Sequence, residues 1–242
     1  ISPIAVAYNL PGFTGESHVN MTGEVLAKVL SGAITRWNDP ALTALNPGAT
    51  LPDLRIIVVG RSDDSGTTKA LTTYLATVAP KAWPHEPEET WPLRGGQSGD
   101  GTAGMIQTVY AATGTIGYAD AYKVPATLGT VAVGSNGAYV PVSAKAAAAA
   151  LDAATLGAEA DETRLLYQPS HDAEGAYPIV LVSYLAARLR YDDARIAAVV
   201  KAYLRFAAST RGKDDSTKAT GCAPITREMR EKINAAIDKI AA

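Results

Sequence analysis

Two hydrophobic patterns alternate along this chain of 242 residues. Continuous apolar runs at residues 4–8, 56–59 and 179–184 are typical of strands covered on both faces, and residues 115–118 form a shorter strand pattern. Between these runs, apolar residues recur at helical spacing. The predicted helices lie between Thr22 and Gly32, between the loop at residues 61–68 and Pro80, and at residues 105–110, 144–154, 196–208 and 227–240. Strands that alternate with helices indicate an α/β fold with crossover connections.

Residues 80–101 show neither pattern. Residues 80–93 are rich in proline, contain two tryptophans and lead into the glycine-rich residues 95–101, so we expect a long surface loop. Because Gly99-Asp100-Gly101 directly precedes a predicted helix, it fits either a second anion-facing loop or a helix start with Asp100 as the N-cap. We favour the N-cap.

Residues 61–68 (RSDDSGTT) form a loop in which a predicted strand leads directly into a predicted helix. The first turn of a helix leaves backbone N–H groups unpaired and carries partial positive charge, which favours an anion. Gly66 has no side chain to obstruct the anion, and Ser65 and Thr67 add hydroxyl donors. Arg61 offers a planar fork that grips two oxygens, and Asp63 can hold that fork in place. The loop is therefore a candidate oxyanion site.

Local chemistry alone leaves a second interpretation of this loop open. The same residues fit an ordinary helix N-terminus, in which Ser65 is the cap and Arg61 and Asp63 form a surface ion pair worth roughly 0–1 kcal/mol. The loop also lacks the lysine and the spaced first glycine of a Walker motif, which argues against nucleotide hydrolysis.

Composition argues against several classes of protein. The 22 basic and 24 acidic side chains nearly balance, so nothing favours a nucleic-acid partner or a membrane surface held by charge. The longest apolar run, around residues 146–151, is far shorter than the roughly 20 residues of a transmembrane helix. Cys222 is the only cysteine, so no intrachain disulfide can form and the compartment stays open.

Sequence features of a metal site or a catalytic site are also missing. His18, His85 and His171 lie far apart and have no second ligand at metal-binding spacing, so we expect neither a metal nor a cofactor. A hydrolytic role for Ser65 would call for the Gly-x-Ser-x-Gly pattern, which the loop does not have. We therefore expect a binding protein and no enzyme.

Five blocks of the sequence resemble, in order, the phosphate-binding receptor of the bacterial phosphate ABC transporter. They are IAVAYNLPG (4–12), MTGEVLAKVLSGAITRWNDPALTALNPG (21–48), VVGRSDDSGTTKALTTYL (58–75), GTIGYADAY (114–122) and AYPIVLVSY (176–184). The resemblance implies a two-lobe periplasmic-binding-protein fold of type II. It also implies that the protein collects inorganic phosphate outside the cell membrane for an ABC permease.

The resemblance assigns roles to residues of the loop. The phosphate-binding residues that it implies are Arg61, Ser65, Gly66 and Thr67, with Asp63 orienting Arg61. Asp64 departs from the pattern, because the family usually has glycine there. Since a second carboxylate close to an anion is repelled by it, we expect Asp64 to point to solvent.

The matching blocks begin after an N-terminal segment that, in the family, supplies the opposite wall of the cleft. Mapped onto the family, residues 1–177 form a complete lobe that carries the anion loop, and residues 178–242 form the returning strand and helices of an incomplete second lobe. Three explanations are open. The chain is a piece of a longer receptor, a shortened relative completed by a second chain, or a domain that kept the fold and lost binding.

The expected protein is thus an extracellular or periplasmic lipoprotein, anchored to the membrane through a segment outside this chain. Its expected partners are inorganic phosphate, an ABC permease, and the missing segment or a second chain that completes the lobe. The alternative is a non-transport extracellular sensor or interaction module that reuses the fold with weak or no phosphate binding. The sequence does not choose between phosphate and other tetrahedral oxyanions.

Overall fold

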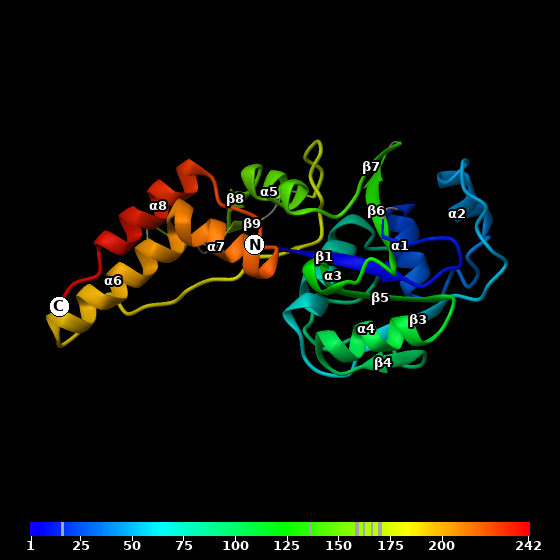
Figure 1. Ribbon diagram of the computed structural model, residues 1–242, viewed down its shortest axis with the longest axis horizontal. Coiled ribbons are helices and arrows are strands. Elements are labelled where there is room, and N and C mark those ends of the chain that lie inside the picture. The colour runs from blue at the N-terminus through cyan, green and yellow to red at the C-terminus, as the bar shows by residue number, and fades with distance from the viewer. Residues whose placement is uncertain (16, 136, 158–159, 162, 166, 169–170) are drawn as a thin grey trace.

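The computed structural model describes residues 1–15, 17–135, 137–157, 160–161, 163–165, 167–168 and 171–242. Figure 1 shows two parts along the longest axis, a sheet with its helices and a separate group of three C-terminal helices. In this group α6 (Ala194–Ala208) packs against both α7 (Thr210–Thr220) and α8 (Arg227–Asp238). No helix of the described residues is long and apolar enough to cross a membrane.

The large sheet is built around β1 (Ser2–Tyr8), which is antiparallel to both of its long neighbours. The strand order is β2 (His18–Thr22), β6 (Gly129–Ser135), β1, β5 (Thr115–Asp120), β3 (Ile57–Arg61) and β4 (Gln97–Gly99). The pairs β2–β6, β3–β5 and β3–β4 are parallel. Ligands of such α/β sheets bind beyond the carboxyl ends of the strands, and the loop at residues 61–68 leaves β3 at that end.

Short strands complete the β-structure. In the large sheet, β7 (Ala138–Val140) pairs with β6, and β10 (Val180–Leu181) pairs with β1. A separate two-stranded ribbon consists of β8 (Thr155–Leu156) and β9 (Tyr167–Gln168).

Side chains at the N-caps fix where several helices begin. Thr22 accepts a hydrogen bond from the Val25 N–H at the start of α1 (Gly23–Leu30), and Ser143 does the same for the Ala146 N–H in α5 (Ala144–Asp152). The remaining helical segments of this part are α2 (Pro40–Leu45), α3 (Gly66–Val78), α4 (Gly101–Ala111) and the 3₁₀ turn η1 (Ala121–Lys123).

The core lies around β1, and its largest fully buried side chains are aromatic. Tyr8 and Trp37 are both fully buried, and their ring centroids are 5.3 Å apart. The Trp37 Nε1–H donates to the Gly114 carbonyl at 3.0 Å, which satisfies the one polar group of the indole. Trp83 is also buried, so the proline-rich loop is anchored in the core by its own side chain.

Most elements predicted from the apolar patterns are confirmed. The predicted strands correspond to β1, β3 and β5, and the predicted helices to α1, α3, α4, α5, α6 and α8. The patterns missed β2, β6, β7, α2 and α7. The glycine-rich segment was expected to be loop throughout, but residues 97–99 pair with β3 as strand β4.

The strand expected over residues 179–184 is much shorter than predicted. Only Val180 and Leu181 pair, with Pro3 and Ser2 of β1, and Ile179 adds a hydrogen bond from the Ile4 N–H to its carbonyl at 2.9 Å. Beyond Leu181 the described residues offer no further strand partner, and Tyr184 is half exposed. The apolar run therefore predicted the strand but not its length, because a strand extends only as far as a neighbouring strand pairs with it.

Candidate functional site

The loop at residues 61–68 forms the N-terminus of α3. Ser65 has extended backbone angles and caps the helix, because its Oγ accepts a hydrogen bond from the Thr67 N–H at 3.1 Å. Among the described residues, none accepts a hydrogen bond from the backbone N–H of Gly66 or Thr68. These two donors remain available to an anion at the positive end of the helix.

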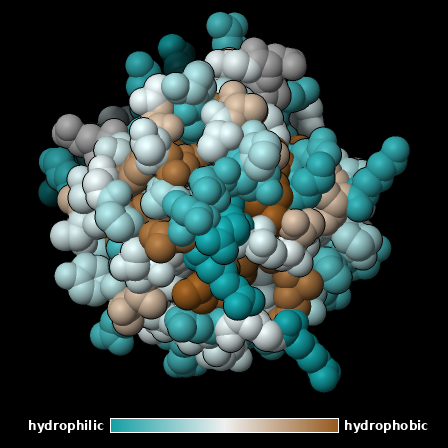
Figure 2. Space-filling model, turned by 90° about the vertical axis from the view of Figure 1, so that its right-hand side faces the viewer, coloured by the Kyte–Doolittle hydropathy of each residue, from teal (hydrophilic) through white to brown (hydrophobic). Residues whose placement is uncertain are grey.

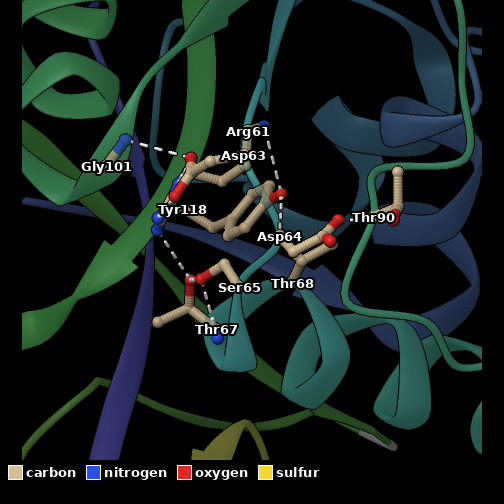
Figure 3. Close-up of polar contacts among 9 residues, drawn as sticks. All are labelled: Arg61, Asp63, Asp64, Ser65, Thr67, Thr68, Thr90, Gly101 and Tyr118. Atoms are coloured by element: carbon tan, nitrogen blue, oxygen red, sulfur yellow. Dashed lines mark hydrogen bonds and ion pairs between the residues drawn. The ribbon is translucent and has the colours of Figure 1, made fainter.

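Arg61 lies at the end of β3 with its side chain turned toward the start of α3 (Figure 3). Its Nε and Nη2 donate to the two oxygens of Asp63 at 2.7 and 2.5 Å, and its Nη1 donates to the Thr67 Oγ1 at 3.2 Å. A guanidinium has five N–H donors, so Nη1 and Nη2 each keep one for a ligand. Only 7% of the Arg61 side chain is exposed, which fixes the direction of those donors.

The charges of this pair stabilise each other. The pKa of the Asp63 carboxyl lies well below its usual range, first because the Arg61 side chain donates hydrogen bonds to it and second because the Gly101 N–H does so as well. The same hydrogen bonds, donated by Arg61 to Asp63, raise the pKa of Arg61. Asp63 thus holds the Arg61 fork in one orientation and keeps it charged.

Asp63 also connects the loop to the neighbouring helix α4. Its Oδ1 accepts a hydrogen bond from the N–H of Gly101, the first residue of α4, at 3.0 Å. We expected Asp100 to cap this helix, but Asp100 occupies the N-cap position without a side-chain hydrogen bond. The predicted N-cap position of Asp100 is therefore confirmed, whereas the side-chain hydrogen bond at this helix start comes from Asp63.

Tyr118 of β5 supports the loop from inside the protein, and the sequence analysis missed it. Its hydroxyl accepts a hydrogen bond from the Arg61 backbone N–H at 3.3 Å and lies 2.8 Å from the Thr68 Oγ1. Burial raises the pKa of Tyr118, so the hydroxyl stays neutral. A tyrosine in an otherwise apolar strand signals that its hydroxyl has a buried partner, although not which one.

Asp64 lies on the other side of the loop from Arg61 and Asp63 (Figure 3). Its side chain is exposed, as expected, and its Oδ1 accepts a hydrogen bond from the Thr90 hydroxyl at 2.6 Å. The adjacent Ser65 N–H donates to the Glu89 carbonyl at 2.9 Å. Residues 89 and 90 therefore contact the start of α3 directly, which the sequence did not indicate.

The three histidines lie in separate environments. His18 contacts the Thr130 hydroxyl at 3.0 Å, His85 lies beside Trp83, and His171 packs against the Tyr74 ring. Within the described ranges, no group of three or more His, Cys, Asp or Glu residues could hold a metal ion.

Two of the cavities among the described residues lie away from the anion loop. One cavity, of about 240 Å³, lies beside α6 and α8, and another, of about 530 Å³, lies at the start of β3. Neither is lined by residues 61–68. Figure 2 views the molecule from the side of α1 and α2, and it shows hydrophobic residues in recesses between hydrophilic side chains on that face.

Replacing Asp63 with asparagine tests the ion pair through its pH dependence. Because the folded-state pKa of Asp63 is lowered, the pair adds stability above the unfolded carboxyl pKa of about 4, and this stability is lost as the pH falls through the folded-state pKa. We therefore expect Asp63→Asn to be less stable than the wild type near neutral pH, with a difference that shrinks on acidification. Urea unfolding at a series of pH values measures this, and a difference independent of pH would contradict it.

Comparison with known proteins gives a match over most of the chain. A protein-family model described as "PBP superfamily domain" matches residues 1–211. The chain is 32% identical to the phosphate-binding protein PstS 3 of Mycobacterium tuberculosis, over 99% of this chain and 65% of that protein. It is also 32% identical to the phosphate-binding protein PstS of Pasteurella multocida, over 94% of this chain and 65% of that protein. The chain thus spans 65% of the length of these relatives.

Solved structures support the fold class predicted from the sequence. A phosphate-binding protein from Stenotrophomonas maltophilia aligns with a TM-score of 0.68 and 20% identity, over 97% of this chain and 68% of that one. A periplasmic phosphate-binding protein (PfluDING) bound with phosphate aligns with a TM-score of 0.69 and 21% identity, over the same shares of the two chains. At these identities the likeness establishes the fold, a periplasmic-binding-protein fold of type II.

Proposed function

Because this chain belongs to the PBP superfamily, we propose that its loop at residues 61–68 binds inorganic phosphate. The proposed binding residues are Arg61, Ser65, Gly66 and Thr67, and the proposed role of Asp63 is to orient Arg61. The observation that carries this proposal is that the Arg61 guanidinium contacts the first turn of α3, where the N–H groups of Gly66 and Thr68 have no acceptor among the described residues.

The arrangement suits a tetrahedral oxyanion on physical grounds. Backbone N–H groups at a helix start and the outer N–H groups of a guanidinium approach from different directions, as the oxygens of a tetrahedral ion require. The Ser65 and Thr67 hydroxyls are hydrogen-bonded to each other at 2.7 Å, so one of the two hydrogens remains for a bound anion. Asp64, the one other carboxylate of the loop, is directed away from these donors.

We further propose that the protein serves as the solute receptor of an ABC importer on the outer side of the cell membrane, without catalytic activity. The relatives in Mycobacterium tuberculosis and Pasteurella multocida are named phosphate-binding proteins, which supports phosphate as the solute in this proposal. In this proposal residues 1–177 form the lobe that carries the anion loop, and residues 178–242 belong to the other lobe. The wall opposite the loop would come from a preceding segment or from a second chain.

Isothermal titration calorimetry of the 242-residue protein with phosphate tests the proposal. We expect binding of one phosphate per chain with a Kd below about 1 mM, which corresponds to about −4 kcal/mol. Parallel titrations with sulfate and chloride measure selectivity, and we expect chloride to give no binding. Absence of phosphate binding at millimolar concentrations would overturn the proposal and favour the sensor or interaction module.

A further inference from the structure

The anion loop contains a second carboxylate, Asp64, immediately before the helix cap Ser65. Unlike Asp63, which is bound by Arg61, Asp64 has no cationic partner among the described residues. Its one hydrogen bond there comes from the Thr90 hydroxyl, at 2.6 Å. Figure 3 shows that this contact directs the Asp64 carboxylate away from Arg61 and Thr67.

A freely rotating Asp64 would oppose anion binding in two ways. Its charge would repel an oxyanion bound a few ångströms away. It would also be attracted to the same unpaired N–H groups of Gly66 and Thr68, because a helix N-terminus favours any carboxylate as it favours phosphate. Asp64 would thus compete with the ligand from within the chain.

Thr90 is well placed to prevent this, because the residues on both sides of it are fixed. On one side the Glu89 carbonyl accepts a hydrogen bond from the Ser65 N–H at 2.9 Å. On the other side the Trp91 indole packs on Gly60, where an added Cβ would lie 2.4 Å from the Trp91 Cδ1. The Thr90 hydroxyl is therefore held at a constant position relative to the start of α3.

We propose that Thr90 is a positioning residue for anion binding, which holds the Asp64 carboxylate away from the bound oxyanion. Thr90 itself does not touch the ligand. It acts because its single hydroxyl hydrogen is donated to Asp64 in a charge-assisted hydrogen bond. This inference rests on the proposed phosphate site and adds to it a residue 26 positions away in the sequence.

The experiment replaces Thr90 with valine, which keeps the shape of the side chain and removes the hydroxyl. Thr90 is exposed, so the change leaves the core intact. We expect the phosphate Kd to rise by about fivefold to tenfold at low ionic strength, and the effect to shrink in about 1 M salt, which screens charges beyond about 3 Å. Thr90→Ser keeps the hydroxyl and is expected to bind phosphate like the wild type.

Two further variants separate a positioning role from a purely structural one. In an Asp64→Asn background the charge is absent, so adding Thr90→Val is expected to leave the Kd unchanged. Thr77→Val is the matched control, because Thr77 is an exposed residue at the other end of α3 whose hydroxyl donates to the Thr73 carbonyl at 2.8 Å. We expect this control to bind phosphate like the wild type.

The outcomes distinguish this inference from the proposed function. If the wild type binds phosphate and Thr90→Val leaves the Kd unchanged, Thr90 has no positioning role. A loss of affinity that persists in the Asp64→Asn background would equally overturn the inference, because it would not depend on the carboxylate charge. A wild type that binds no phosphate would overturn the proposed function, and the inference with it.

Discussion

Replacing Arg61 with alanine is expected to weaken phosphate binding by roughly 100-fold or more, because it removes a buried, charge-assisted donor from the site. The same change removes the ion pair of Asp63, which would then face the anion as an uncompensated negative charge. Both effects act against the ligand. Calorimetric titration of the purified variant with phosphate measures the loss.

Two further substitutions control this experiment. Arg61→Lys keeps the positive charge but not the planar fork that contacts Asp63 and Thr67 together, so we expect it to recover only part of the lost affinity. Arg36→Ala removes an exposed arginine that pairs with Asp53, and we expect wild-type binding from it. An Arg61→Ala variant that still binds phosphate within about threefold of the wild type would show that the ligand lies elsewhere.

Replacing Trp37 with alanine is expected to lower the free energy of unfolding by about 3–5 kcal/mol, among the largest losses for any single residue here. The indole is fully buried, packs on Tyr8 and donates to the Gly114 carbonyl, so its removal leaves a cavity and an unpaired buried carbonyl. Urea unfolding followed by circular dichroism measures the change, with ΔG taken from the midpoint and slope.

A graded series checks the physical cause of that loss. Trp37→Phe keeps an aromatic ring but not the N–H donor, so we expect an intermediate loss of about 1–3 kcal/mol. Tyr110→Ala removes an aromatic side chain that is 59% exposed and is expected to change stability by less than about 0.5 kcal/mol. Equal stability of Trp37→Ala and the wild type would mean that the indole does not anchor the core.

How well the sequence predicts this fold depends on how each element is buried. Strands β1 and β3 stood out because each contains an uninterrupted apolar run and pairs with a strand on both sides. Strand β2 was missed because it alternates buried and half-buried residues over only five positions. Helix α7 was missed because its sequence, TRGKDDSTKAT, is polar throughout and carries no apolar stripe.

The candidate site was predictable where its residues are close in sequence. Arg61, Asp63, Ser65 and Thr67 follow one another within a single loop, so their types and spacing were enough to predict that they meet. Tyr118, Gly101 and Thr90 reach the same loop from 57, 38 and 26 residues away. Only the packing of β5, α4 and the proline-rich loop brings them together, and no local pattern encodes that packing.

The aromatic side chains beneath the anion loop give the protein an optical property. The Trp83 and Trp91 rings are 5.5 Å apart, and Trp91 is 5.4 Å from Tyr118, whose hydroxyl contacts the Arg61 backbone. At such separations the excitation energy of Tyr118 is transferred to the Trp91 indole. The Trp91 and Trp83 indoles exchange excitation energy in the same way. The fluorescence emission of Trp91 is therefore expected to change when a ligand binds at Arg61, so that binding can be followed without an attached dye.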